Sequence, residues 1–204
     1  MDDIRNLRAL QLDALREVAN IGAGHAATAL SQMTGHKIMI SVPLIQIAQL
    51  EDIPNQVSDG EEPVAAVLMK MLGDLTGLTL LVFPRATALK VAALMMKRPV
   101  GPDFGVLEQS AIKEAGNILS AAYLNALSEF MGMILLPSPP SLAIDMSDAV
   151  LNSTYLEVAS GADYVFCVES EFNLTDLGER LRGFFLLMPD VGSLNAILRA
   201  IRVA

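Results

Sequence analysis

Three polar side chains lie along one face of the first helix that the sequence predicts. Asp13, Glu17 and Asn20 are spaced by four and then three residues, which places all three on the same side of a helix. Carboxylates only accept hydrogen bonds, whereas a carboxamide both donates and accepts. The next residue on this face is Gly24, and a small residue there leaves room for another molecule. We therefore expect a binding or catalytic surface on this helix.

The same pattern occurs again 97 positions later. Ser110, Glu114 and Asn117 repeat the spacing on a second predicted helix, and a proline follows each asparagine after 22 intervening residues, at Pro43 and Pro140. At average composition, one copy would arise by chance in roughly one chain of this length in a few hundred. Two copies at equivalent positions therefore favour a functional role for the Glu and Asn residues over a solvated helix face. For Asp13 and Ser110 both interpretations stay open.

The surrounding residues predict the elements that must hold these motifs in place. Helical apolar spacing, β-branched runs and glycine or proline breaks predict the order helix, strand, hairpin, helix, written twice. The predicted elements are helix 12–31, strand 38–47, hairpin 64–72 and 78–83, and helix 86–96, then helix 106–130, strand 134–144, hairpin 164–174 and 181–188, and helix 192–201. Prolines weaken the strand at 134–144, which predicts a sheet edge or a bulge.

These elements predict an α+β fold that arose by internal duplication. One domain, residues 1–204, would consist of two repeats of about 1–100 and 104–204. We expect the repeats to share one β-sheet about a pseudo-two-fold axis, with both long motif helices on one face. The offset between the repeats grows along the chain, which predicts an insertion at about 147–162.

The composition excludes several classes of function. The chain has 204 residues and is 52% hydrophobic but only 5% aromatic, so an aliphatic core is expected. Acidic residues outnumber basic ones by 23 to 14, which argues against binding to nucleic-acid phosphates or to an anionic membrane surface. One cysteine and two histidines offer no metal site. We expect no metal and no cofactor of the protein's own. The absence of a signal peptide and of a long apolar run predicts a cytoplasmic protein without membrane insertion.

The doubled motif, the length and the two-half plan resemble the CheC family of chemotaxis phosphatases, which also includes CheX- and FliY-type proteins. The segment from Asp13 to Asn20, followed by Ile-Gly-Ala-Gly, is especially similar to the first helix of CheC-type members. The resemblance implies a phosphatase that hydrolyses the aspartyl phosphate of the response regulator CheY. It also implies that Mg²⁺ is held by the receiver domain of that substrate, and that the glutamine deamidase CheD is a candidate partner.

The resemblance also implies roles for the motif residues. Asn20 and Asn117 would orient the attacking water, a role that suits a carboxamide because it can donate to and accept from one water. Glu17 and Glu114 would dock on the receiver, since a carboxylate placed at phosphoryl oxygens would repel them. Leu119 in the second copy occupies the position of Gly22 in the first copy and is bulkier. This difference predicts that both sites are competent but unequal.

Two other functions compete with the phosphatase. The helix faces could belong to a non-catalytic module that binds a receiver or CheD. A small-molecule sensor between the halves is a third option, although the sequence shows no convergent polar pocket. His25 is expected at the surface, His36 in solvent at a turn, and Cys167 as a small buried hydrophobe.

Overall fold

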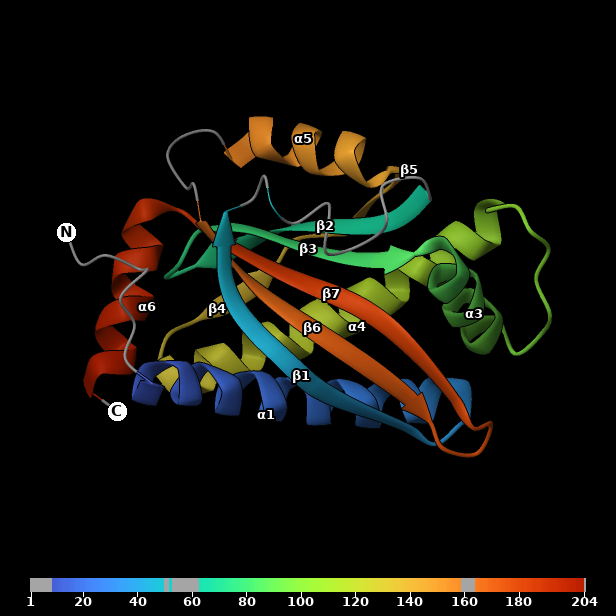
Figure 1. The fold of residues 1–204 in the computed structure, drawn as a ribbon, viewed down its shortest axis with the longest axis horizontal. Helices are drawn as coiled ribbons and strands as arrows, with labels where there is room; N and C mark the ends of the chain where they lie inside the picture. Colours follow the sequence, from blue (N-terminus) through green and yellow to red (C-terminus); the bar gives the residue numbers. More distant parts are fainter. Residues whose placement is uncertain (1–8, 50–51, 53–62, 159–163, 204) are drawn as a thin grey trace.

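The computed structural model describes residues 9–49, 52, 63–158 and 164–203. Within these residues the chain forms five helices and one seven-stranded antiparallel sheet (Figure 1). The elements are α1 (Ala9–Thr34), β1 (Ile38–Gln49), β2 (Pro63–Gly73), β3 (Gly77–Pro84), α3 (Arg85–Met96), α4 (Val106–Met131), β4 (Leu135–Pro137), β5 (Ser141–Met146), α5 (Ser147–Val158), β6 (Tyr164–Leu174), β7 (Glu179–Pro189) and α6 (Val191–Val203). This agrees with the predicted element order, and the segment expected as an insertion contains α5.

The sheet interleaves strands from the two halves of the sequence. Its order is β1-β6-β7-β3-β2-β4. Both β4 and β5 pair with the outer edge of β2: β4 with its C-terminal end and β5 with its N-terminal part. The hairpins β2–β3 and β6–β7 meet at the centre through the β3–β7 pair. Each edge strand pairs with the hairpin of the other half, since β1 lies beside β6, and β4 and β5 lie beside β2. The described sheet is therefore shared between the halves, as expected.

Both motif prolines lie where an edge strand is interrupted. The register of β1 against β6 shifts between Ser41 and Leu44, around Pro43. Pro140 lies in the short break between β4 and β5. Proline has no N–H group to donate to a neighbouring strand, so it is compatible with a sheet edge or a bulge. The predicted weak second strand is confirmed as two short edge strands.

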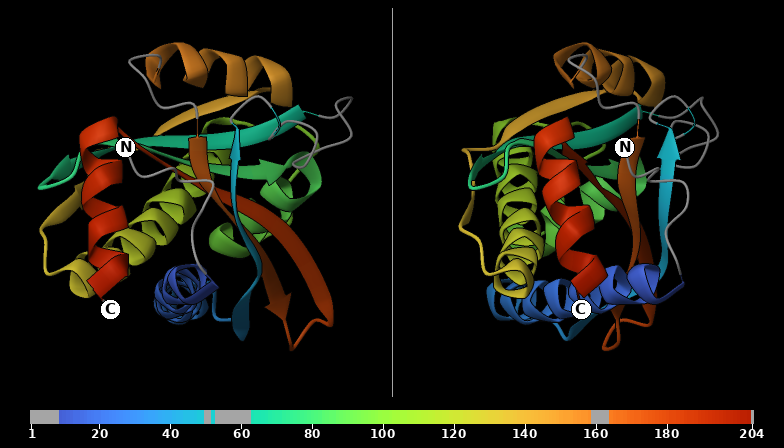
Figure 2. Two further views of the ribbon diagram at one scale, coloured as in Figure 1. Left: turned by 60° about the vertical axis from the view of Figure 1, so that its left-hand side comes forward. Right: turned by 90° about the vertical axis from the view of Figure 1, so that its left-hand side faces the viewer.

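Helices cover both faces of the sheet (Figure 2). The larger core lies under α1, α3 and α4 and includes Val67 and Met69 of β2. The smaller core lies under α5 and includes the alternate residues Val64 and Ala66 of the same strand. Alternate side chains of a strand point to opposite faces, so β2 contributes to both cores. The two motif helices therefore share one face of the sheet.

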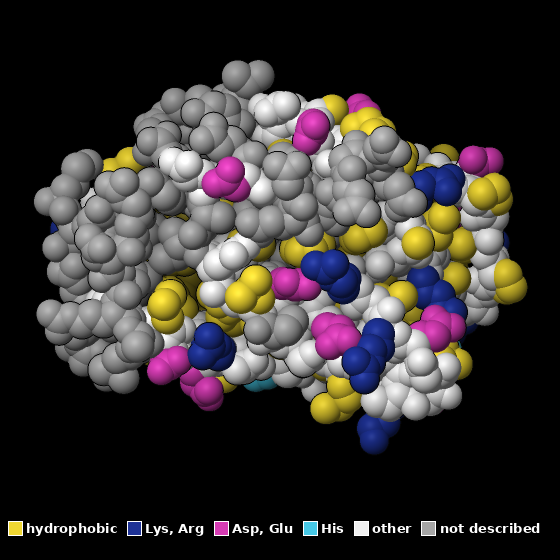
Figure 3. Space-filling view, in the orientation of Figure 1, with side chains coloured by type: hydrophobic (Ala, Val, Ile, Leu, Met, Phe, Trp, Pro, Cys, Tyr) yellow, Lys and Arg dark blue, Asp and Glu magenta, His cyan; other side chains and the backbone are white. Residues whose placement is uncertain are grey.

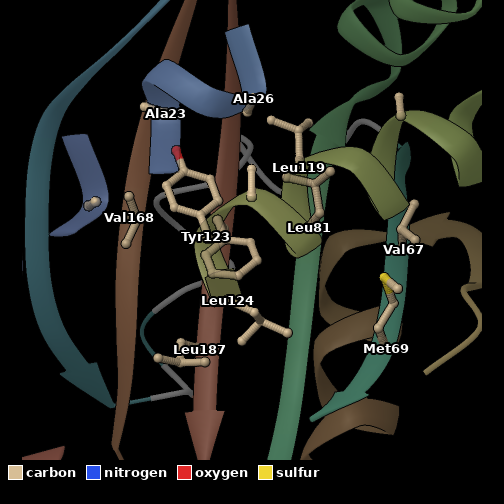
Figure 4. Packing of buried hydrophobic residues seen from close by; sticks show 14 of the residues in the cluster. Ala23, Ala26, Val67, Met69, Leu81, Leu119, Tyr123, Leu124, Val168 and Leu187 are labelled. Atoms are coloured by element: carbon tan, nitrogen blue, oxygen red, sulfur yellow. The ribbon is translucent and has the colours of Figure 1, made fainter. Parts of the chain in front are cut away.

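The close contact of α1 with α4 depends on Gly22. A Cβ atom at this position would lie 2.7 Å from Cδ1 and 3.0 Å from Cα of Tyr123. Tyr123 is itself held from the sheet side: its ring stacks on Phe185 at 4.6 Å between centroids, and its hydroxyl shares a 2.8 Å hydrogen bond with Ser170. Burial raises the pKa of Tyr123 to about 12. Figure 4 shows this ring between the α1 segment and the strands. The contact fixes α1 on α4 and both helices on the sheet.

Each motif helix ends in the same kind of turn. Gly35 and Gly132 adopt positive φ angles of 80° and 65°, which favour glycine. The hydroxyl of Ser31 accepts a 3.0 Å hydrogen bond from the N–H of Ile38, and that of Ser128 donates to the carbonyl oxygen of Met133. The Ala-Leu-Ser sequence common to both helices therefore has a structural explanation, because its serine bonds to the chain that follows the helix: Ser31 to the start of β1, and Ser128 to the turn before β4.

Substituting Gly22 tests the helix contact. We expect Gly22→Ala to lower the free energy of unfolding by about 1–3 kcal/mol, because the added methyl group overpacks the interface with Tyr123. The matched control is Gly24→Ala, whose Cβ would meet no atom within 4 Å. This control should raise stability by up to about 1 kcal/mol through helix propensity alone. Denaturant unfolding of both variants measures the difference, and equal stabilities would contradict the proposed contact.

Candidate functional site

The first motif lies on the exposed side of α1. Asp13, Glu17, Asn20 and Gly24 are all exposed, as their predicted spacing requires. The opposite side of the helix is buried in the larger core and consists mainly of small residues, including Ala19. The motif side chains therefore point away from the sheet and are accessible to another molecule.

The second motif is placed in the same way on α4. Ser110 and Glu114 are exposed and Asn117 is half-buried, whereas Ile112 and Leu119 on the opposite side are buried. In each helix the carboxamide follows the carboxylate by three residues, or about 4.5 Å along the helix axis. The structure thus brings together the Glu and Asn of each copy on one exposed helix face.

Within the described part of the chain, the central motif side chains have no hydrogen-bond or ion-pair partner. Asp13 makes an exposed 3.0 Å ion pair with Arg16. Across the described residues, no hydrogen bond or ion pair engages Glu17, Asn20, Glu114 or Asn117. Two carboxylates and two carboxamides are therefore available to a partner, the former as hydrogen-bond acceptors and the latter as both donors and acceptors.

A match to a known family covers these two motif segments. The CheC-like family model matches residues 10–46 and 107–144. The match shows a likeness to the CheC-like family in these two segments. Both CheC-like segments begin within a motif helix and extend past the proline that follows it. The family match and the motif geometry therefore coincide on the same residues.

Relatives and solved structures extend the likeness beyond the two CheC-like segments. The chain is 29% identical to the CheY-P phosphatase CheC of Bacillus subtilis, over 98% of both chains. The flagellar motor switch phosphatase FliY of the same organism is 28% identical over 70% of this chain and 38% of its own length. The crystal structure of Thermotoga maritima FliY has a TM-score of 0.81 at 24% identity, covering 97% of this chain and 98% of that one. This structural likeness shows that the fold is shared.

The sequence predicted unequal sites because Leu119 in the second copy is bulkier than Gly22 in the first. The structure shows that this reason is wrong. Gly22 and Ala23 are buried against α4 and leave no space beside the motif. Leu119 is only 1% exposed and points into the core, so its bulk does not reach the motif face of α4. A helix packed on both a sheet and a second helix buries a wider arc than a simple apolar stripe. Unequal activity of the two sites stays a prediction without this support.

The motif prolines do not lie on the exposed helix faces. Pro140 is half-buried in the break between β4 and β5, and the side chain of Pro43 lies outside the described residues. Both occupy interrupted edge strands, where proline has a structural reason to be present. Their contribution to a site stays a prediction.

The sequence reasoning missed three exposed apolar side chains next to the motifs. Ile21 follows Asn20 and is 40% exposed, while Val106 and Leu107 at the start of α4 are 84% and 62% exposed. Continuing the motif spacing backwards from Ser110 would have placed Leu107 on the same helix face. The surface that surrounds the second motif is therefore partly apolar.

The two histidines, to which the sequence assigned no role in the site, lie away from the motif faces. His25 is exposed on α1, as expected. His36 was expected to face solvent; its side chain is 34% exposed and forms a 2.8 Å hydrogen bond with Asp176. That hydrogen bond holds the pKa of the Asp176 carboxyl below its usual value.

Within the described residues no group of three His, Cys, Asp or Glu side chains could hold a metal ion, and no helix could span a membrane.

The cavities in the described part of the structure are small or open. A cavity of about 50 Å³ between α1, α4 and the sheet is lined by apolar side chains such as Leu15, Phe166 and Ile197. Small-molecule sites are typically several hundred Å³. A larger hollow of about 420 Å³ lies at the surface near Lys70 and Ser138. The apolar interior space therefore gives the sensor hypothesis no support.

Alanine substitutions at the motif distinguish a functional face from a structural one. We expect Glu17→Ala, Asn20→Ala, Glu114→Ala and Asn117→Ala each to change the free energy of unfolding by less than about 0.5 kcal/mol, because these side chains make no hydrogen bond or ion pair among the described residues. Alanine also has a higher helix propensity than either residue. Thermal and denaturant unfolding measure the effect. A loss of more than about 1 kcal/mol would assign a structural role to that residue.

Cys167 gives a test that depends on pH. Burial, followed by the charge of Glu169, raises the pKa of this thiol to about 12. We expect the native protein to react slowly with a thiol reagent from pH 7 to pH 9.5, because the reactive thiolate stays scarce. In denaturant the rate should rise through pH about 8.5, the ordinary thiol pKa. A native rate that follows the denatured curve would contradict the buried position.

Proposed function

We propose that the chain hydrolyses the aspartyl phosphate of a phosphorylated CheY-type receiver domain in the cytoplasm. The observation that carries this proposal is the pair of Glu–Asn faces on α1 and α4 within the CheC-like segments. Glu17, Asn20 and Glu114 are exposed, Asn117 is half-buried, and none of the four has a polar partner among the described residues. Two relatives of the chain are named CheY-P phosphatase CheC and flagellar motor switch phosphatase FliY. Their names support the same substrate for this chain.

The carboxamide of Asn20 or Asn117 is suited to the hydrolytic step. Phosphoryl hydrolysis requires a water held in line with the bond that breaks, and catalysis consists largely of positioning and electrostatic stabilisation. An exposed carboxamide accepts one hydrogen bond from this water through its oxygen and donates from its NH₂ group. It carries no charge and so does not repel the phosphoryl oxygens.

The carboxylates of Glu17 and Glu114 dock the receiver beside the reacting phosphate. Each lies one helical turn before its asparagine and can accept hydrogen bonds from a cationic side chain of the receiver. Contact with such a cation fixes the distance between the asparagine and the phosphorus atom. Mg²⁺ is held by the receiver's own carboxylates, where it offsets the charge of the phosphoryl group. The motif residues of this chain are not required to bind it.

A direct attack by water fits the nucleophiles that the chain contains. Its one cysteine, Cys167, is buried in β6, and its pKa is raised to about 12, so its thiolate is scarce. His36 is engaged with Asp176 at the turns that precede β1 and follow β6, away from the motif faces. The proposed mechanism uses direct attack by water and needs no covalent intermediate on this chain.

Internal duplication of one helix–strand–hairpin–helix unit is part of the proposal. The motif, the serine turn and the element order recur at nearly constant spacing, and a single family model matches both segments. The interleaved strand pairing supports one domain, residues 1–204, formed from both repeats. Such a protein carries two sites for a receiver.

Substituting the two asparagines tests the reaction. We expect Asn20→Ala and Asn117→Ala each to retain part of the phosphate release from phosphorylated receiver, and the double variant to lose at least about a hundredfold. That factor is at the lower end of what removal of one catalytic positioning or proton-transfer group costs. The assay uses catalytic amounts of the chain with Mg²⁺ present, and Asn125→Ala, another exposed asparagine on α4, serves as the control. Full activity in the double variant would exclude the assigned role.

The main competing function is a non-catalytic module that binds a receiver or CheD through the same faces. This alternative predicts binding of phosphorylated receiver without turnover when the receiver is in excess. It also predicts that both Asn variants leave the rate of dephosphorylation equal to that of the receiver alone. Binding of CheD stays a prediction and is measured separately with purified protein.

A further inference from the structure

We infer that Val106 and Leu107 form an apolar part of the receiver-binding surface at the α4 site. This inference rests on the proposed function, because the receiver is the occupant that would cover these residues. They are 84% and 62% exposed, and Val106 is the most exposed large apolar side chain among the described residues. Neither belongs to a core cluster of the described residues.

The helix geometry aligns this apolar pair with the catalytic pair. At 100° per residue, Leu107 lies seven residues before Glu114 and so within about 20° of it around the helix. Val106 lies eleven residues before Asn117 and is also within about 20° of it. Each apolar side chain is therefore in line with one of the two motif side chains on α4.

The start of α4 is held rigidly by side chains on its other sides. Glu108, whose side chain is only 12% exposed, pairs with Arg98 at 3.3 Å. The side chain of Gln109 donates a 2.9 Å hydrogen bond to the carbonyl oxygen of Phe104. These contacts fix the first turn while Val106 and Leu107 remain exposed. A pre-ordered apolar pair loses little conformational entropy when a partner covers it.

A receiver docked on the motif would extend over this pair. A standard protein interface buries about 800 Å² on each partner, which corresponds to a disc of about 16 Å radius. Leu107 and Val106 lie about 10 and 12 Å along the helix from Glu114. The receiver surface that reaches them should be apolar and lie about 15 Å from its phosphorylated aspartate, because Leu107 is ten residues from Asn117, which faces the phosphate.

The inference applies to the α4 site alone. The counterparts of Val106 and Leu107 in α1 are Ala9 and Leu10, whose side chains lie outside the described residues. Because alanine is smaller than valine, Ala9 also offers less apolar area than Val106 does. The experiment therefore starts from a Glu17→Ala, Asn20→Ala background, in which only the α4 motif is complete.

The test variant in this background carries Val106→Ser and Leu107→Ser. Serine is compatible with the first helical turn, where N–H groups have no intrahelical acceptor. The matched control carries Ile134→Ser and Leu136→Ser, which are 65% and 57% exposed. The control residues follow the end of α4, whose last residue Met131 lies about 25 Å along the axis from Glu114. Circular dichroism and thermal unfolding verify that both variants are folded.

Two measurements separate binding from hydrolysis. Steady-state phosphate release gives KM and kcat for phosphorylated receiver. Calorimetry gives Kd for a receiver that carries beryllofluoride in place of the phosphoryl group. We expect the test variant to raise both KM and Kd about tenfold with kcat unchanged, which is a loss of about 1.4 kcal/mol in binding. The control variant should leave all three values unchanged.

Other outcomes distinguish this inference from the proposed function. Unchanged KM and Kd in the test variant would overturn the inference, as would an equal loss in the control variant. Absence of any receiver binding would overturn it too. If the background protein binds the receiver but does not hydrolyse its phosphate, the proposed reaction fails at the α4 site. The inference still stands in that case if the serine pair weakens binding.

Discussion

The contact between Gly22 and Tyr123 determines how both motif helices are presented. Because Gly22 has no side chain, the α1 backbone approaches the Tyr123 ring directly, and that ring is stacked on Phe185 of the sheet. Two helices and a sheet thus meet at one aromatic side chain. A change in this contact would rotate or displace α1 relative to α4, and each Glu–Asn pair would move with its helix. In a close-packed interior such a shift cannot be absorbed locally.

The remaining surface of the sheet is polar and stabilised by exposed ion pairs. Glu169 pairs with Arg182 at 2.8 Å, and Glu171 with Arg180 at 3.4 Å, between the neighbouring strands β6 and β7. Figure 3 shows acidic and basic side chains together where these strands run in Figure 1. Exposed pairs of this kind contribute about 0–1 kcal/mol each. Their larger effect is to keep the uncovered part of the sheet soluble while the opposite face holds the motif helices.

Much of the fold and of the candidate site could be predicted from periodicity and spacing. Helical spacing placed Glu17, Asn20, Glu114 and Asn117 on exposed faces correctly, because side chains three and four residues apart share a helix face. Proline chemistry located the interrupted strand that follows α4. Contacts between residues far apart in the sequence could not be predicted, because they depend on tertiary packing. The burial of Leu119 does follow from helical spacing, since it lies seven residues after the buried Ile112 on the same face. The partner of His36, by contrast, lies 140 residues away at Asp176. No local pattern contains that information.

The pairing of β1 with β6 has a consequence for how the chain folds. Ile38 of β1 is opposite Leu174 of β6, which lies 136 positions later in the sequence. At a synthesis rate of about 5–20 residues per second, the N-terminal strand emerges on the order of ten seconds before its neighbour exists. Pairings of such long range close slowly, because the entropy of a large loop is lost before the contacts form. During that interval the hydrogen-bonding edges of β1 and of the first hairpin are both unpaired. Bulges and prolines in edge strands make them poorer templates for pairing with other chains. The register shift around Pro43 therefore makes β1 a poorer template of this kind until β6 is available.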